Sequence, residues 1–250
     1  MTPDASLPQS DHVLLGAFRQ GKSPAQTQRE ADYIERLLEL SPPGAHLLDV
    51  PCGAGRLAVE LAARGYRVTG VDREPSLIDD AQHAAAARDV SAAVRVEPRD
   101  MRDLPWPGTF DGAYCFWESF GFFDDEGNRA FLAAVAAALK PGSRFVFDTH
   151  IVETMLPRLS KRTWDRLDDD LLVLEETHYD HVDSTMTRHL TMIQGEHSAR
   201  LDITTRLYTY RELVTLLESA GFTGCEGYTW MSTLPFILGA PRLVMVAQRS

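Results

Sequence analysis

The sequence has 250 residues, of which 44% are hydrophobic and 24% charged, and its formal net charge is −11. These values suit a globular protein with one large core, and the negative charge argues against a nucleic-acid partner. No apolar stretch approaches the length of a membrane span, so a membrane partner is not expected.

The cysteines and the first residues predict where the protein is located. Cys52, Cys115 and Cys225 lie far apart without a CxxC pair, so neither a disulfide framework nor a structural zinc site is expected. Residues 1–10 lack the charged and then apolar pattern of a signal peptide. The sequence therefore predicts a cytoplasmic protein.

The first predicted elements are a loop and a helix. Residues 20–28 are polar, contain glycine and proline, and predict a loop. Residues 31–40 predict a helix, because Tyr33, Ile34 and Leu37 recur at helical spacing.

From residue 45 onward, short apolar runs alternate with segments of helical periodicity. The predicted strands are residues 46–50, 67–72, 92–97, 112–117, 144–148 and 243–248. The predicted helices between them are residues 56–64, 75–88, 125–139 and 210–220. Continuous apolar strands joined by helices are typical of a sheet that is buried on both faces. The expected fold class is therefore α/β, with a Rossmann-like doubly wound sheet.

One segment interrupts this alternation. Residues 172–179, 186–193 and 201–208 alternate between apolar and polar side chains, which predicts half-buried strands. We expect a small antiparallel β flap inserted after strand five. The predicted domains are a helical cap (1–40), a cofactor-binding core (41–150), the flap with a substrate-side insertion (151–208), and the C-terminal part of the core sheet (209–250).

The strongest local signal is a glycine loop between the first predicted strand and its helix. Gly53 and Gly55 allow a ligand to approach the backbone closely and place amide groups at a helix N-terminus. The spacing Gly53-x-Gly55-x-x-Ala58 also fits the dinucleotide fingerprint of NAD-binding proteins. The glycines alone therefore leave two cofactor classes open.

Asp49 favours a cationic ligand at this loop. A carboxylate four residues before Gly53 would repel the pyrophosphate of a dinucleotide, whereas it would attract the sulfonium and amino groups of S-adenosylmethionine. The alternative is that Asp49 only forms a hydrogen bond within the loop.

Two more carboxylates follow predicted strands. Asp72 ends the second strand and suits both hydroxyls of a ribose, and Asp100 with Met101 follows the third strand and suits an adenine. A single aspartate at a strand end is usually part of a turn, but three at one sheet edge indicate a nucleoside site.

At this point the sequence resembles the class I S-adenosylmethionine-dependent methyltransferases. The matching segments are residues 49–55, 70–72, 100–105, 110–114 and 139–142. Residues 119–123, 173–176 and 206–209 resemble a branch of small bacterial members of that family. The resemblance implies a seven-stranded sheet whose last strand is antiparallel.

The resemblance also implies a set of cofactor-binding residues. In chain order they are Asp49, Cys52, Gly53, Gly55, Asp72, Arg73, Asp100, Met101 and Trp117. The glycines and Asp49 are expected at the methionine part, Asp72 at the ribose, and Asp100 with Met101 at the adenine.

Residues near the strand ends are candidates for chemistry. A histidine side chain can accept a proton, so His150 is the candidate general base, although a histidine that only forms a hydrogen bond in its loop is an equal alternative. Glu118, Arg206 and Tyr208 are candidate substrate contacts, and solvent or sheet-edge roles stay open for the last two. No metal site is expected, because histidines three apart on a strand, such as His178 and His181, point to opposite faces.

The sequence as a whole predicts an S-adenosylmethionine-dependent methyltransferase. We expect it to move a methyl group to an oxygen or nitrogen of a small molecule by in-line displacement. The alternatives are an NAD-dependent oxidoreductase, or a protein that binds S-adenosylmethionine without methyl transfer. A homodimer is compatible with the sequence.

Overall fold

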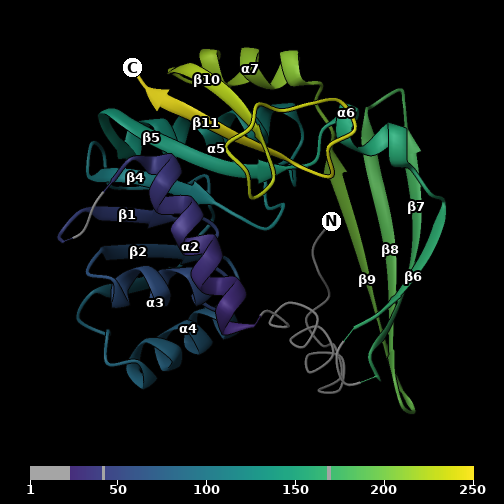
Figure 1. The fold of residues 1–250 in the computed structure, drawn as a ribbon, viewed down its shortest axis with the longest axis horizontal. Helices are drawn as coiled ribbons and strands as arrows, with labels where there is room; N and C mark the ends of the chain where they lie inside the picture. Colours follow the sequence, from purple (N-terminus) through teal and green to yellow (C-terminus); the bar gives the residue numbers. More distant parts are fainter. Residues whose placement is uncertain (1–22, 41–42, 168–169) are drawn as a thin grey trace. The chain divides into compact units, whose positions relative to one another are not determined.

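The computed structural model describes residues 23–40, 43–167 and 170–250. It separates into two compact units, one of residues 24–157 with 207–250 and one that includes residues 158–206. Each unit is described by itself (Figure 1). The predicted cap over residues 1–40 lies partly outside the described residues, and the predicted domain limits stay predictions.

The first unit is built on a seven-stranded sheet with the order β10-β11-β5-β4-β1-β2-β3. Strands β1 to β5 pair in parallel, whereas β11 lies antiparallel between β5 and β10. Their bounds are β1 (His46–Asp49), β2 (Arg67–Asp72), β3 (Val94–Pro98), β4 (Phe110–Cys115), β5 (Leu139–Thr149), β10 (Phe222–Thr229) and β11 (Leu243–Arg249). The predicted fold class is confirmed, including the antiparallel last strand.

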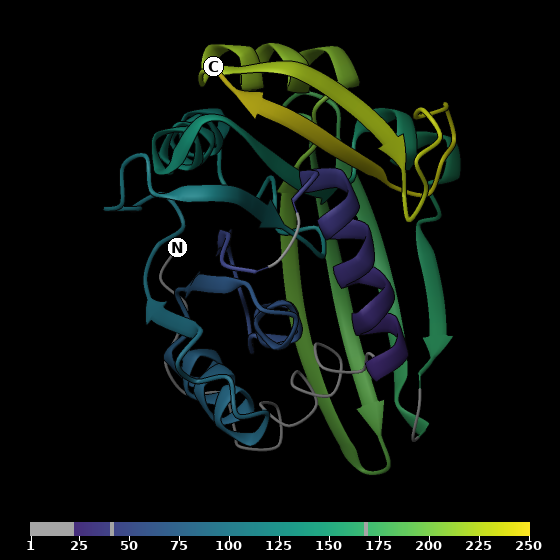
Figure 2. The same cartoon turned by 60° about the vertical axis from the view of Figure 1, so that its left-hand side comes forward.

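Helices cover both faces of this sheet. Leu47 and Leu48 are neighbours in β1 and therefore point to opposite faces. Leu47 packs in a cluster with residues of α2 (Pro24–Leu38) and α3 (Arg56–Ala63). Leu48 packs in another cluster with residues of α5 (Asp125–Ala138) and α7 (Tyr210–Ser219). Helix α4 (Pro75–Ala87) lies beside α3, and Figure 2 shows α7 beside the edge strand β10.

Local capping sets where two of these helices begin. Asp124 precedes α5, and its side chain accepts a hydrogen bond of 2.8 Å from the Gly127 amide. Thr209 precedes α7 and forms a capping box with Glu212. These contacts satisfy amide groups that have no partner within the helix. After β5 come the short helix α6 (Val152–Met155) and the 3₁₀ turn η1 (Leu156–Arg158).

The second unit is a four-stranded antiparallel sheet, with β6 (Arg162–Arg166), β7 (Leu172–Asp180), β8 (Thr185–Gln194) and β9 (His197–Arg206) in that order. One face is apolar, because Val173, Met192 and Ala199 are buried and lie opposite one another across β7, β8 and β9. The other face is mostly exposed. The predicted antiparallel flap after the fifth strand is therefore present.

One local prediction is wrong, and two strands were not predicted. Residues 20–28 do not form a loop from Pro24 onward, because Pro24 begins α2; proline suits the first helical turn, where its missing N–H is not needed. The edge strands β6 and β10 were not predicted. Every residue of β6 is exposed, and β10 contains two glycines and a register shift, so neither has the apolar pattern of a central strand.

None of the helices among the described residues has both the length and the apolar composition to cross a membrane. A cytoplasmic location stays a prediction.

Candidate functional site

The carboxyl ends of β1, β2, β4 and β5 meet at one edge of the seven-stranded sheet. Asp49 at the end of β1 lies opposite Gly70 of β2 and Tyr114 of β4. Strand β5 pairs in parallel with β4 and ends at Thr149, so His150 follows at the same edge. Open α/β sheets bind ligands at this edge.

Asp49 is a deeply buried carboxyl at this edge, with only 3% of its surface exposed. Burial raises the pKa of the Asp49 carboxyl to about 8, against the opposing effects of the nearby Tyr114 hydroxyl and the charge of Arg56. The Tyr114 hydroxyl is buried and has no hydrogen-bond partner of ordinary geometry in the described part of the chain. Asp49 is therefore mostly neutral at neutral pH, and a nearby cation would favour its ionised form.

The glycine loop is fixed to β2 at two points. Asp72 Oδ2 accepts a hydrogen bond of 3.0 Å from the Gly53 amide, and the Cys52 amide donates one of 2.8 Å to the Val71 carbonyl. Gly53 has a φ of +52°, and nothing lies within 4 Å of the place where a Cβ would stand. The loop therefore has a left-handed turn that favours glycine and open space on one side.

Gly55 is required for packing as well as for the turn. It has a φ of +74°, and a Cβ at this position would lie 2.7 Å from the Cβ of Ala81 in α4. A larger residue would therefore separate α3 from α4. The sequence pattern indicated a ligand role for Gly55 but did not indicate this helix contact.

The carboxylates expected at the ribose and the adenine already have partners in the protein. Asp72 Oδ1 accepts a second hydrogen bond of 3.0 Å, from the Glu74 amide. Asp100 forms a two-point ion pair with Arg102 at 2.9 and 2.7 Å, and this contact lowers the pKa of the Asp100 carboxyl. Met101 beside it is buried, whereas Arg73 is exposed.

A strained turn follows β4. Trp117 and Glu118 have φ values of +69° and +60°, which bulky residues adopt only when the surroundings impose them. Asp148 of β5 supplies this constraint, because its two carboxylate oxygens accept hydrogen bonds from the amides of Trp117 (2.6 Å) and Glu118 (3.2 Å). Asp148 is completely buried, and burial raises the pKa of its carboxyl to about 6.

Arg242, just before β11, connects the turn to His150. Its guanidinium pairs with Asp148 at 2.9 Å and with Glu118, and it lies 4.4 Å from the centre of the Trp230 ring. The Glu118 carboxylate also lies 3.0 Å from Nε2 of His150. The other ring nitrogen of His150, Nδ1, is buried without a hydrogen-bond partner among the described residues.

Helix α2 contacts the same turn through Glu30, of which only 1% is exposed. The Glu30 carboxylate accepts hydrogen bonds from the Arg56 guanidinium (2.6 Å) and from Nε1 of Trp117 (3.1 Å). Arg56 begins α3 directly after the glycine loop, so Glu30 connects α2, the loop and the turn.

Sequence reasoning missed Glu30, Asp148, Trp230 and Arg242. Asp148 stood at the end of a predicted strand, as Asp49 and Asp72 did, and that position was a signal. The other three come from α2 and from the segment between β10 and β11, whose sequence has no spacing that relates them to the site.

Two predicted substrate contacts have other surroundings. Tyr208 is buried; its hydroxyl donates to Asp125 Oδ1 (2.8 Å) and accepts from Asn128 Nδ2 (3.1 Å), so it holds α5. Arg206 ends β9 in the second unit. In the described part of the chain, no three His, Cys, Asp or Glu side chains are arranged to hold a metal ion.

Residues 47–142 match the model of a family described as a methyltransferase domain. The chain is 38% identical over 106 residues to the O-methyltransferase resE of Aspergillus sclerotiorum. The alignment covers 42% of this chain and 39% of that protein. The chain thus spans less than half the length of the curated relatives that it matches.

Solved structures agree with this chain over almost its whole length. A S-adenosylmethionine-dependent methyltransferase from Clostridium acetobutylicum has a TM-score of 0.78 at 19% identity, covering 96% of this chain and 97% of that one. The SAM-bound amino pentose methyltransferase CalS10 from Micromonospora echinaspora has a TM-score of 0.69 at 22% identity and full coverage of both chains. At these identities the comparison establishes the fold.

Proposed function

We propose that this protein is an enzyme that transfers a methyl group from S-adenosylmethionine to a small molecule. The match of residues 47–142 to a methyltransferase domain and the class I methyltransferase fold support this proposal. The acceptor atom is an oxygen or a nitrogen. The matched relative is named an O-methyltransferase and one structural neighbour a sugar N-methyltransferase, so the names of the similar proteins include both atoms.

The observation that supports this proposal best is the buried Asp49 carboxyl beside the glycine loop. A carboxyl that is held neutral only by burial gains most from a cation, and S-adenosylmethionine has a sulfonium and an amino group. The carboxylate of Asp72 is a second negative group at the same loop. A dinucleotide would place its pyrophosphate against these two groups, so the residues fit S-adenosylmethionine better.

The remaining cofactor contacts follow the same edge. We assign Asp49, Gly53, Gly55 and Cys52 to the methionine part, and Asp72 with Arg73 to the ribose side. Asp100 and Met101 are assigned to the adenine; Asp100 must then share its carboxylate with Arg102. Trp117 is assigned to the wall of the site, where Glu30 and Asp148 hold it.

The bound cofactor would supply an activated methyl group for in-line displacement, so the protein has mainly to orient the acceptor and exclude water. His150 is the candidate base. If Nε2 donates its proton to Glu118, Nδ1 keeps a lone pair that accepts the proton of an alcohol or an ammonium. Glu118 then orients the ring.

Binding measurements test the cofactor. In isothermal titration calorimetry, S-adenosylmethionine and its demethylated product should bind, whereas NAD should not. Binding of NAD alone would refute the methyltransferase and support an oxidoreductase. Incubation with methyl-labelled S-adenosylmethionine and candidate metabolites, followed by mass spectrometry, should reveal a labelled product. Cofactor binding without methyl transfer to any acceptor tested would favour the alternative of a protein that binds S-adenosylmethionine but does not transfer its methyl group.

A further inference from the structure

The exposed face of the four-stranded sheet in the second unit has an ordered pattern of side chains. Register places Arg162, Glu176, His189 and Asp202 in one row across β6, β7, β8 and β9. The next row is Trp164, Leu174, Thr191 and Arg200, and the one after it is Arg166, Leu172, Ile193 and Ser198. All of these side chains point to the face opposite the buried Val173 and Met192.

This face is unusual for a surface in water. Trp164 is 69% exposed, and its cross-strand neighbour Leu174 is 38% exposed. Leu172 and Ile193 extend the apolar area in the adjacent row. A contiguous apolar area rimmed by charges is typical of a protein interface.

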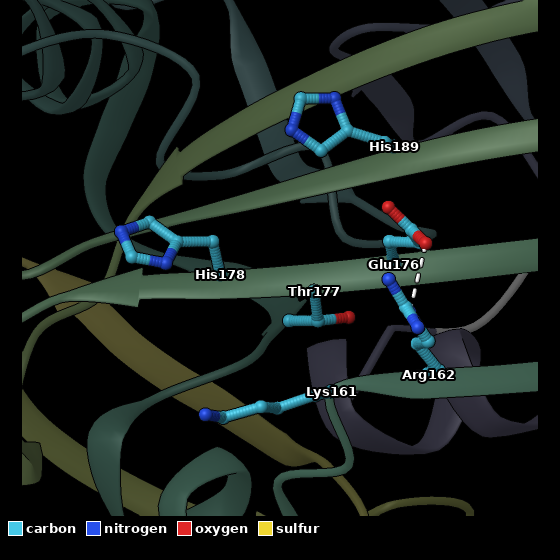
Figure 3. A pocket seen from close by; sticks show the side chains of 6 residues that line it. All are labelled: Lys161, Arg162, Glu176, Thr177, His178 and His189. Atoms are coloured by element: carbon cyan, nitrogen blue, oxygen red, sulfur yellow. Dashed lines mark ion pairs between the residues drawn. The ribbon is translucent and has the colours of Figure 1, made fainter.

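Figure 3 shows Arg162, Glu176 and His189 of the charged row beside this area. Arg162 and Glu176 form an ion pair of 2.9 Å between neighbouring strands, and both remain more than half exposed. His178, His189 and Lys161 line the same shallow hollow of about 320 Å³. In this view Lys161 and Arg162 come from the chain at β6, and the histidines come from β7 and β8.

Each row is complementary in charge and polarity to the same row of a second copy when the order of the strands is reversed. A two-fold axis parallel to the strands, between β7 and β8, would place β6 of one copy over β9 of the other and β7 over β8. Arg162 would then face Asp202 of the second copy, and Glu176 would face His189. In the next row Trp164 would face Arg200, which is a favourable cation–π pair. In the row after it Leu172 would face Ile193.

The same charges disfavour the other face-to-face arrangement. A two-fold axis in the interface plane but perpendicular to the strands would place each strand over the same strand of the second copy. Centred on the Trp164 row, it would place Arg162 over Arg166 and Arg200 over Arg200. Like charges in direct opposition are destabilising. Centred between the Arg162 and Trp164 rows, a perpendicular axis would pair Asp202 with Arg200 but would leave Glu176 over Leu174. The axis parallel to the strands gives every charge of the Arg162 row an opposite partner, so it is the more complementary arrangement, and aligned packing of two sheets at about −30° is common.

We propose that the exposed face of β6–β9 is the interface of a homodimer, in which two copies pack face to face about a two-fold axis parallel to the strands. Each pair of the interface occurs twice, as an isologous interface requires. Leu174 and Thr191 lie nearest the axis, Trp164 and Arg200 face each other on the outer strands, and Arg162 with Asp202 fixes the register.

Charge reversal in the full chain tests this geometry. Sedimentation velocity should give twice the chain mass for the parent at micromolar concentration. Arg162→Asp and Asp202→Arg should each weaken the dimer by at least about tenfold, because each places two like charges in opposition. The double variant R162D/D202R should recover the dimer. An equimolar mixture of the two single variants should recover it as well, since each mixed dimer contains two opposite-charge pairs.

Arg166→Asp is the matched control, because Arg166 lies on the same strand and face but would oppose the neutral Ser198. It should dimerise nearly as the parent does. Far-ultraviolet circular dichroism verifies that each variant is folded. A monomeric parent would overturn the proposal, and so would equal weakening by Arg162→Asp and Arg166→Asp, or no recovery in the double variant and the mixture.

Discussion

Asp49 lies where stability and ligand binding have opposite requirements. Its folded-state pKa is raised from 3.8 to about 8 by burial, so the stability that the neutral carboxyl provides is lost as pH rises through about 8. Ionisation costs less when a cation is bound. A buried carboxyl at this position is therefore unfavourable for the free protein and favourable for the complex.

Replacing Asp49 by asparagine tests this conflict. At about pH 9 the free energy of unfolding of the variant should exceed that of the parent by at least about 1 kcal/mol. Below about pH 5 this difference should shrink, because the Asp49 carboxyl of the folded parent is then neutral as well. Thermal unfolding at both pH values measures it. S-adenosylmethionine affinity should fall in the variant, and in the parent it should rise with pH up to about 8.

Asp72 is the second carboxylate that contacts the glycine loop. Asp72→Ala should weaken S-adenosylmethionine binding by about 1–3 kcal/mol, because charged hydrogen bonds are lost. Calorimetry of this variant can be compared with Asp103→Ala, which removes another carboxylate from an exposed ion pair of the same unit. An affinity equal to that of the parent would mean that the ribose lies elsewhere.

His150 is tested by separating binding from turnover. If Nδ1 is the base, His150→Ala should lower the rate of methyl transfer by roughly 10²-fold and leave cofactor affinity unchanged. His178→Ala, an exposed histidine in the second unit, is the matched control. Equal rates in His150→Ala and the parent would assign His150 a purely structural hydrogen bond.

At the scale of elements, the site depends on a turn that the backbone does not favour. Two consecutive non-glycine residues in the left-handed region are kept there by Asp148, which itself pairs with Arg242. Three elements thus meet at this carboxylate, namely the ends of β4 and β5 and the start of β11.

Protonation of Asp148 should therefore impair the turn. Its carboxyl has a raised pKa of about 6, so its ion pair with Arg242 weakens as pH falls through this value. We expect the turnover rate to decline below about pH 6. Asp148→Asn, which keeps the shape but not the charge, should be slow at every pH. In His150→Ala, which lacks the candidate base, the decline below about pH 6 should persist, and adding Asp148→Asn should abolish it. If the turnover rate of this double variant depended on pH as that of His150→Ala does, protonation of Asp148 would not be the cause of the decline.

At the scale of the whole molecule, the net charge of −11 acts on every ligand that approaches. S-adenosylmethionine is a net cation at neutral pH, so its association rate should fall by roughly threefold or more between low and high salt. Stopped-flow fluorescence of the tryptophans can measure this rate. Adenosine, which is uncharged, should bind at a rate that salt hardly changes; equal salt dependence for both ligands would exclude electrostatic attraction.

The sheet could be predicted from the sequence because its central strands are buried on both faces. In β2 residues 68–71 are all buried for that reason, and the predicted bounds of this strand, residues 67–72, equal those of β2. The edge strands β6 and β10 each pair with one neighbouring strand only. Their sequences are polar or contain glycine, so no local pattern predicted them.

The amino-acid sequence by itself determined the fold class and the glycine loop with the carboxylates that follow the first three strands. These are local features, because a strand end and the turn after it are contiguous in the chain. Only the tertiary structure brought Glu30, Asp148 and Arg242 to the turn at Trp117, and aligned Arg162, Glu176, His189 and Asp202 in one row. Such contacts depend on strand order and register, which are set by the packing of the whole chain and not by the spacing of neighbouring residues.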